Sequence, residues 1–217
     1  MIGVDVYSDL SCPWCYVGKR RLDKAIEQFT AAKVCVNWHP YIIDKNTAPE
    51  GEEYMAYNSR RWGGDGWTHS LRSAGQKDGL EFKNWKTWPN SLNGHRLIHL
   101  AGVQKGAEGQ GQAKDVLFRM IYEDGMNISD LNTLTQAAKE LGLQGAEDYL
   151  KSTNDVDFIW SEDLRAKTEM RISSVPYFVI SNDGETKKAI SMSGAQGTEQ
   201  FLAAFHRVSL QNYAVAL

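Results

Sequence analysis

The first 43 residues combine two apolar runs with one amphipathic stretch. Residues 2–7 are expected to form a buried strand, and a second strand is expected over residues 34–38, continuing through residues 41–43. Between them, apolar residues recur at helical spacing from Trp14 to Phe29, with Lys and Arg on the other face. Ser11 is the expected N-cap of this helix, and Pro13 suits its first turn. This order predicts a right-handed βαβ unit with parallel strands.

After residue 45 the pattern of polar and apolar residues changes twice. Residues 46–80 are polar and glycine-rich, with an expected break at residues 63–66. Helical patterns then recur over residues 91–103, 112–123, 130–141, 147–151 and 156–170. The chain closes with a strand at residues 175–180, a turn at residues 181–184, a strand at residues 188–192 and a helix at residues 198–208. The predicted order is therefore βαβ, a helical block, and ββα.

Composition and charge narrow the class of protein without deciding its chemistry. The 217 residues are 42% hydrophobic and 24% charged, as is typical of a globular protein with a sizeable core. A net charge of -3 gives no general attraction to nucleic acid or to an anionic membrane. No apolar run approaches the ~20 residues that span a bilayer. No basic segment followed by a long apolar segment opens the chain, so we expect a cytoplasmic protein.

The three cysteines are Cys12, Cys15 and Cys35, a low and odd number that argues against a disulfide framework. Cys12 and Cys15 flank Pro13 and Trp14 at the expected strand-to-helix turn. In a cytosolic chain, such a Cys-x-x-Cys pair is more often catalytic or metal-binding than structural. The first question is therefore whether the pair performs redox chemistry or holds a metal.

The position of Cys12 at the start of a helix favours redox chemistry. A helix N-terminus favours negative charge, so we expect it to lower the pKa of Cys12 and to favour the thiolate. Cys15 lies one turn further and should be more buried, which suits it to resolve a mixed disulfide formed on Cys12. Pro13 removes one backbone donor near the sulfur, and Trp14 supplies bulk and a surface for an apolar substrate.

Zinc binding is the main alternative for the cysteine pair. The obvious additional ligands are Cys35 and His39, which lie four residues apart in an expected strand. In an extended strand they would be roughly 13 Å apart, too far to share one zinc ion without a sharp bend. Cys35 alone is more typical of a small buried apolar residue. We therefore expect no metal at this site.

Val175-Pro176 is the second informative feature, because proline donates no hydrogen bond to a sheet. One interpretation is an edge position or the start of a strand. The other is a cis peptide bond before the strand, which would expose the backbone of Val175 to a substrate chain.

Together these motifs resemble the thioredoxin superfamily, and within it the DsbA-like group of FrnE-like dithiol-disulfide oxidoreductases. The resemblance rests on Asp-Leu-Ser-Cys-Pro-Trp-Cys-Tyr-Val-Gly at residues 9–18, Gly-His-Arg-Leu at residues 94–97, Val-Pro-Tyr-Phe-Val-Ile at residues 175–180 and Ser-Gly-Ala-Gln at residues 193–196. It implies an α/β thioredoxin fold with a large α-helical insertion. The thioredoxin-fold domain would comprise residues 1–45 and 166–217, and the inserted domain residues 46–165. It also implies that Cys12 is the nucleophile, that Cys15 is the resolving cysteine and that Pro176 is a cis proline facing them.

The resemblance implies a thiol-disulfide oxidoreductase or isomerase that needs no cofactor. Its partner would be a disulfide-containing protein or a small thiol, with glutathione as a possible redox partner. Kappa-class glutathione transferases and hydroxychromene-carboxylate isomerases are similar in layout but usually have serine where Cys12 stands. A glutathione-dependent transferase or isomerase therefore remains an alternative, as does a peptide-binding module. The oligomeric state, the natural substrate and the role of residues 46–80 stay open.

Two further groups of residues carry weaker signals. His95 and His99 are four residues apart on an expected helix, a spacing that can hold a metal, although packing near the active site is favoured. Four tryptophans cluster in the inserted region, where most are expected to be core or loop anchors and one or two could line a groove: Trp62, Trp67, Trp85 and Trp88.

Overall fold

A four-stranded mixed sheet forms the centre of the molecule in the computed structural model, which describes residues 1–182 and 188–210. Its strands are β1 (Ile2–Ser8), β2 (Val34–Pro40), β5 (Tyr177–Asn182) and β6 (Ile190–Ser193), in the order β2-β1-β5-β6. β1 is parallel to β2 and antiparallel to β5, and β5 is antiparallel to β6. The predicted parallel pair is thus confirmed. The turn predicted at residues 181–184 starts too early, because Ser181 and Asn182 still belong to β5, and residues 183–184 lie outside the described residues.

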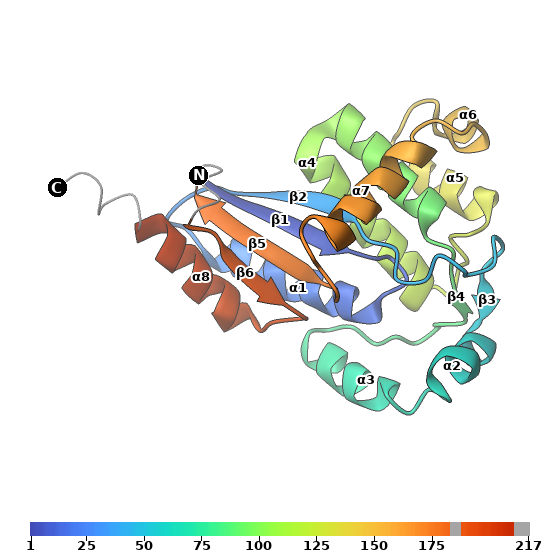
Figure 1. Ribbon diagram of the computed structural model, residues 1–217, viewed down its shortest axis with the longest axis horizontal. Coiled ribbons are helices and arrows are strands. Elements are labelled where there is room, and N and C mark those ends of the chain that lie inside the picture. The colour runs from blue at the N-terminus through green and yellow to red at the C-terminus, as the bar shows by residue number, and fades with distance from the viewer. Residues whose placement is uncertain (183–187, 211–217) are drawn as a thin grey trace.

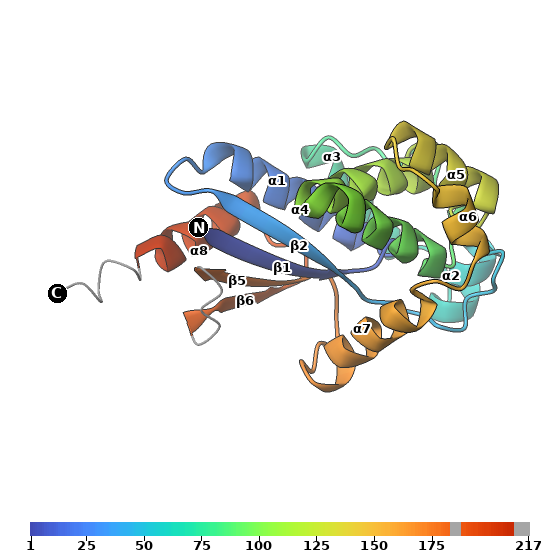
Figure 2. The ribbon, with the colours of Figure 1, turned by 90° about the horizontal axis from the view of Figure 1, so that it is seen from above.

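Two helices cover one side of this sheet (Figures 1 and 2). They are α1 (Pro13–Gln28) and α8 (Thr198–Leu210), which pack on each other. Phe29 and Phe205 join them, with ring centroids 5.3 Å apart. Burial of Val4 and Val6 in β1 and of Phe178 and Ile180 in β5 completes this core, as alternation along a half-buried strand requires. The helices and strands fit the α/β thioredoxin class.

The inserted helices gather beyond the ends to which β1 and β2 point (Figure 1). They include α4 (Leu92–Tyr122), α5 (Leu131–Glu140), α6 (Ala146–Lys151) and α7 (Val156–Thr168). The two helices predicted over residues 91–103 and 112–123 form one long α4 with a kink at Gly106. Glycine tolerates the positive φ of 68° at that kink, where other residues would be strained. α7 lies on the other side of the sheet from α1 (Figure 2).

Residues 46–80 contain elements that the sequence did not predict. These are β3 (Glu52–Glu53), α2 (Tyr54–Trp62) and α3 (Thr68–Lys77), and β3 pairs with β4 (Thr87–Trp88). The N-cap of α2 is Glu53, whose carboxylate accepts from the Ala56 N–H at 2.8 Å, and glutamate is not a typical N-cap residue. The helix ends at Gly63, within the predicted break.

The tryptophans of this region are mostly core residues, as expected. Trp85 and Trp88 are buried, and Trp67 packs against the same core, whereas Trp62 is 52% exposed. Tyr57 stacks on Trp88 with ring centroids 3.9 Å apart. Aromatic packing therefore holds the short α2 against the rest of the insertion.

The expected continuation of the second strand through residues 41–43 is wrong. β2 ends at Pro40, and the next N–H groups donate to side chains instead of to a strand. Ile42 N–H donates to Asp163 at 2.7 Å, and Ile43 N–H donates to Asp9 at 2.8 Å. Two buried carboxylates thus replace the sheet as acceptors for this segment. The domain boundaries at residues 45 and 166 stay a prediction.

Within the described residues, no helix combines the length and the apolar character needed to cross a membrane.

Candidate active site

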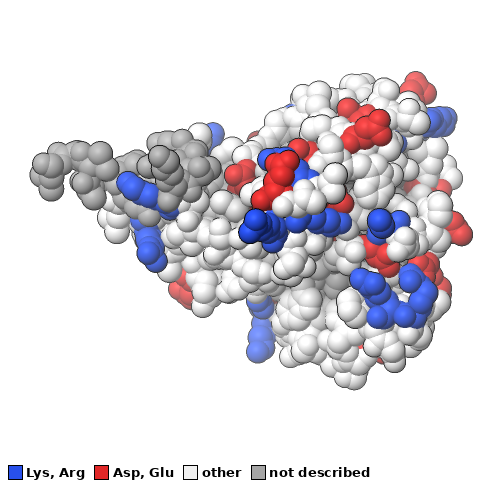
Figure 3. All heavy atoms as spheres, viewed as in Figure 1, with Lys and Arg blue, Asp and Glu red and all other residues white. Residues whose placement is uncertain are grey.

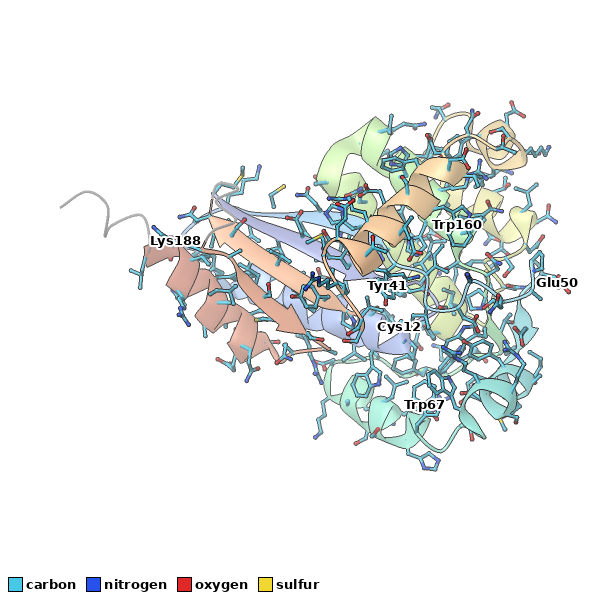
Figure 4. All side chains as sticks on the ribbon, viewed as in Figure 1. Cys12, Tyr41, Glu50, Trp67, Trp160 and Lys188 are labelled. Carbon is cyan, nitrogen blue, oxygen red and sulfur yellow. The ribbon has the colours of Figure 1, made fainter. Side chains whose placement is uncertain are left out.

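The sheet topology brings the cysteine pair and Val175-Pro176 together from opposite ends of the chain. Tyr7 near the end of β1 pairs with Tyr177 at the start of β5. The residues just after β1 therefore face those just before β5. The Val175–Pro176 bond is cis, and the thiol of Cys12 donates to the Val175 carbonyl with an S···O distance of 3.7 Å. Figure 4 shows Cys12 where the strands end and the inserted helices begin.

The start of α1 fixes both sulfurs. Cys12, not the predicted Ser11, is the N-cap, and Pro13 is the first helical residue. The Ser11 hydroxyl donates to Asp9 at 2.7 Å. Cys12 is 6% exposed and Cys15 is 1% exposed, so the expected difference in burial holds. Trp14 is partly buried and packs against the core rather than standing free.

The expected fall in the pKa of Cys12 does not occur in the dithiol form. A hydrogen bond with Cys15 raises the pKa of Cys12 well above its ordinary value, and burial of the thiol adds to this effect. The negative charges of Cys15 and Asp9 raise it further. The Cys15 hydrogen bond, burial and the nearby Asp9 carboxylate thus outweigh the favourable helix N-terminus.

Asp9 is the shared hydrogen-bond partner of several segments around the active-site loop, and the sequence analysis did not identify it. Its fully buried carboxylate accepts from Ser11 N–H at 3.2 Å, and His95 Nε2 lies 3.4 Å away. Burial alone would raise the pKa of Asp9, but the hydrogen bond and charge of His95, together with hydrogen bonds from Ile43 and Ser91, lower it to about 2. With the bond from Ile43, the carboxylate links the cysteine loop to the segment after β2 and to α4.

Lys114 is a second residue that sequence reasoning missed. It is 1% exposed, and its ammonium donates to Ser8 Oγ at 2.8 Å, at the end of β1. Burial lowers the pKa of Lys114 to about 8, against the opposing effect of negative charge on Cys15. The sequence pattern does indicate that Lys114 is buried, because it lies three and four residues before the apolar Leu117 and Phe118, on the same face of the helix.

The paired histidines of α4 have different partners. His95 meets Asp9, whereas His99 Nε2 lies 3.8 Å from Asp155, and its ring packs on Phe158. They therefore do not form the metal pair that their spacing allowed. Among the described residues, no group of three His, Cys, Asp or Glu side chains is arranged to hold a metal ion.

The residues weighed as zinc ligands lie in β2. His39 Nε2 is 3.1 Å from Asp5, and the His39 ring stacks on Tyr7. Cys35 pairs with Gly3 of β1 and is partly exposed, so the expectation of a buried Cys35 is wrong. The cause is its position on the outermost strand of the sheet.

Gly18 lets α1 approach the loop that carries Pro176. A Cβ atom at Gly18 would lie 2.9 Å from Pro176 Cγ and 3.3 Å from Phe178 Cζ. We expect Gly18→Ala to destabilise the fold by about 1–3 kcal/mol, the usual cost of overpacking. We also expect slower disulfide exchange, because Pro176 must shift relative to Cys12. Urea unfolding and an insulin-reduction assay would measure the two effects.

Gly3→Ala is a matched control, since its Cβ would meet only Ser181 Oγ at an ordinary 3.6 Å. Unchanged stability and activity in Gly18→Ala would contradict the close contact.

Residues 3–206 match the model of the DSBA-like thioredoxin domain. The chain belongs to the DsbA-like thioredoxin family. An uncharacterised Bacillus subtilis (strain 168) protein, YwbO, is 28% identical over 212 residues, covering 92% of this chain and 94% of YwbO. The DsbA-like fold with a helical insertion is thereby established, as the resemblance implied.

Two solved structures share this DsbA-like fold. The probable DsbA oxidoreductase SCO1869 from Streptomyces coelicolor superposes with a TM-score of 0.80 at 23% identity, covering 96% of this chain and 90% of that one. The cytosolic disulfide reductase DsbM from Pseudomonas aeruginosa gives a TM-score of 0.69 at 17% identity, covering 96% and 98%. Membership of this family supports a redox enzyme of the disulfide oxidoreductase or isomerase type.

Proposed function

We propose that this protein exchanges disulfides through Cys12 and Cys15. In the reducing direction, the Cys12 thiolate attacks one sulfur of a substrate disulfide, and the other substrate sulfur leaves as a thiolate. Cys15 then loses its proton and attacks the Cys12 sulfur, which releases the second substrate thiolate. The two electrons gained by the substrate come from the Cys12–Cys15 dithiol, which becomes a disulfide.

The observation that carries this proposal is the contact between Cys12 Sγ and the Val175 carbonyl. It supports roles for Val175 and Pro176 beside the reacting sulfur, where a substrate backbone could pair with Val175. Cys15 N–H donates to the Cys12 carbonyl at 3.0 Å, so the second cysteine is one helical turn away and ready to resolve. Pro13 and Trp14 then serve as support, filling the turn between the two sulfurs.

The electrostatics of Cys12 favour reduction of substrates over their oxidation. A strongly oxidising pair is one whose reduced form is stabilised, commonly as a low-pKa thiolate. Here burial and the Cys15 hydrogen bond raise the pKa of Cys12, so this stabilisation is missing. A reductase role would fit a cytoplasmic location, which we propose by analogy with DsbM.

We propose a small thiol or a protein disulfide as the partner. DsbM has been solved with GSH, which makes glutathione the first small thiol to test. Figure 3 shows few charges between the clusters over α7 and α2, and Figure 4 labels Cys12 in this part of the same view, which suits an uncharged segment of a substrate. No cofactor is needed for the exchange steps.

The test compares wild type, Cys12→Ser and Cys15→Ser in insulin-disulfide reduction and in refolding of a scrambled protein. We expect wild type to be active and Cys12→Ser to fall to background. Equal behaviour of all three proteins would contradict the proposal. Glutathione transferase activity that survives in Cys15→Ser would favour the transferase alternative instead.

A further inference from the structure

A groove with a volume of about 560 Å³ is bordered by α7, by residues 42–46 after β2 and by α2. Its volume falls within the range of about 300–1,000 Å³ that is typical of binding sites. The residues of α7 that line it are spaced three and four positions apart, so they share one face of the helix. They are Trp160, Asp163, Leu164 and Lys167. This face of α7 is therefore one wall of the groove.

The groove adjoins the candidate active site through Ile43. This residue lines the groove, and its N–H donates to the carboxylate of Asp9 in the cysteine loop at 2.8 Å. Ile43 and Val175 also pack against one small apolar cluster that includes Tyr41. In the view of Figure 4, Tyr41 lies between Cys12 and α7. A substrate chain that pairs with Val175 can therefore continue into the groove.

Apolar side chains form part of the groove surface. Leu164 is 60% exposed, and Trp160 and Ile43 are partly exposed. Trp160 and Leu164 are one helical turn apart on α7, so they form a continuous apolar strip along this wall. An exposed apolar strip beside charged residues is typical of a surface that binds another chain.

The two carboxylates that line the groove are already neutralised. Asp163 forms an ion pair with Lys167 at 2.8 Å. Asp44 accepts from the Asn46 N–H at 3.0 Å and lies 3.6 Å from Arg60. Both carboxylate side chains are buried, so they do not meet an incoming chain.

Two positive charges of the groove remain without an acidic partner. No carboxylate of the described residues lies within ion-pair distance of Lys45 or Arg61, unlike Arg60, which pairs with Glu52 at 2.7 Å. Both are exposed, and the guanidinium of Arg61 lies over the Trp62 ring, 5.2 Å from its centroid. Figure 3 shows basic side chains over α2 on this face of the molecule. A carboxylate of a partner is the group that complements them.

Resting on the proposed function, we propose that this groove binds the segment of a protein substrate that adjoins its reacting cysteine. The backbone nearest the substrate disulfide pairs with Val175. An apolar side chain of the segment packs on Trp160 and Leu164. A carboxylate of the same segment pairs with Lys45 and Arg61. Proteins with an acidic and apolar segment beside a disulfide are thus the preferred substrate class.

The chemistry of the groove favours a protein segment over glutathione. Glutathione has carboxylates for Lys45 and Arg61 but no large apolar side chain for Trp160 and Leu164. A protein segment supplies both groups on one chain. The apolar strip and the unpaired cations are therefore used together only by a protein substrate.

The test uses peptides with a single cysteine, joined by a disulfide to the coloured leaving group thionitrobenzoate. The Cys12 thiolate of the reduced protein attacks the peptide sulfur and expels thionitrobenzoate as a thiolate, whose absorbance gives the rate. One series carries a Leu-Glu pair at several spacings on either side of the cysteine, and the matched series carries Leu-Gln. We expect the best Leu-Glu peptide to reach its half-maximal rate at a concentration about 10-fold lower than its Leu-Gln match, on the scale of two exposed ion pairs. Added salt should reduce this difference.

Three variants assign the preference to the groove. Lys45→Gln and Arg61→Gln should each reduce the preference for Leu-Glu by about 3-fold, and the double variant should abolish it. Leu164→Gln should weaken binding of the Leu-Glu and Leu-Gln peptides alike, by about 5-fold, because both lose the same apolar contact. Lys33→Gln is the matched control, an exposed lysine just before β2 at the opposite end of the sheet, and it should keep the full preference.

The outcomes separate this proposal from the proposed function. If wild type releases thionitrobenzoate with no preference for Leu-Glu at any spacing, or if the double variant keeps the preference, the groove does not select the substrate. If the double variant slows the mixed disulfide of glutathione as much as the Leu-Glu peptide, the groove binds a small thiol and the protein segment is the wrong occupant. If wild type releases no thionitrobenzoate from any peptide, the proposed function itself is wrong.

Discussion

Replacing Cys15 by serine is expected to stop turnover while leaving the attack by Cys12. Serine cannot displace the substrate sulfur, so Cys12 should remain joined to it as a mixed disulfide. An external thiol is a poor replacement, because Cys12, whose sulfur it would have to attack, is only 6% exposed. We expect turnover to fall by about 10³-fold or more, the scale on which loss of a covalent catalyst slows an enzyme. Insulin reduction and mass spectrometry of the trapped adduct would measure both effects.

Cys35→Ser is the matched control, since Cys35 lies on the outer strand β2, away from Val175. It should turn over like wild type and accumulate no adduct. In Cys15→Ser, an adduct on Cys35 instead of Cys12, or turnover like that of wild type, would contradict the assigned roles.

Removing the carboxylate of Asp9 is expected to cost the most stability of any single change at the site. Asp9→Ala leaves Ser11, Ile43 and His95 without their buried acceptor. Breaking such a buried charged network typically costs about 3–5 kcal/mol. Urea unfolding would measure the loss. Asp5→Ala is the control: Asp5 lies on β1 and is 39% exposed, so its bond to His39 should contribute less than about 1 kcal/mol.

The lowered pKa of Asp9 also predicts how the free energy of unfolding depends on pH. Its pKa is about 2 in the folded protein against an ordinary 3.8, so the folded state holds the ionised form more strongly than the unfolded chain. A lowered pKa stabilises the fold above pH 3.8, and the gain is lost as the pH falls toward 2. The difference corresponds to about 2 kcal/mol. Asp9→Asn should show a smaller loss of unfolding free energy between these pH values, and an unchanged acid profile would contradict the assignment.

Two local motifs in the sequence pointed to the residues that the structure brings together at the candidate site. Cys12, Cys15 and Pro176 each occupy a position whose structural meaning follows from its neighbours, and antiparallel pairing of β1 with β5 joins them. The hydrogen-bond network around Asp9 could not be predicted in the same way. Its partners His95 and Ile43 lie 86 and 34 residues away, and no local pattern reveals such pairing.

The errors in secondary structure have the same origin. The segment at residues 41–43 is apolar enough for a strand, but side chains of Asp9 and Asp163 take its N–H groups. α2 has an atypical cap and depends on stacking between Tyr57 and Trp88. In both places tertiary contacts override local propensity.

Equilibration of the protein against glutathione buffers of graded redox potential tests the central claim most directly. Alkylation and mass spectrometry at each potential would report which cysteines are joined. We predict one two-electron transition between a Cys12–Cys15 dithiol and a Cys12–Cys15 disulfide, with Cys35 outside it. If no Cys12–Cys15 disulfide forms at any potential, or if only Cys35 responds, the pair is not a redox centre and the proposed function is wrong.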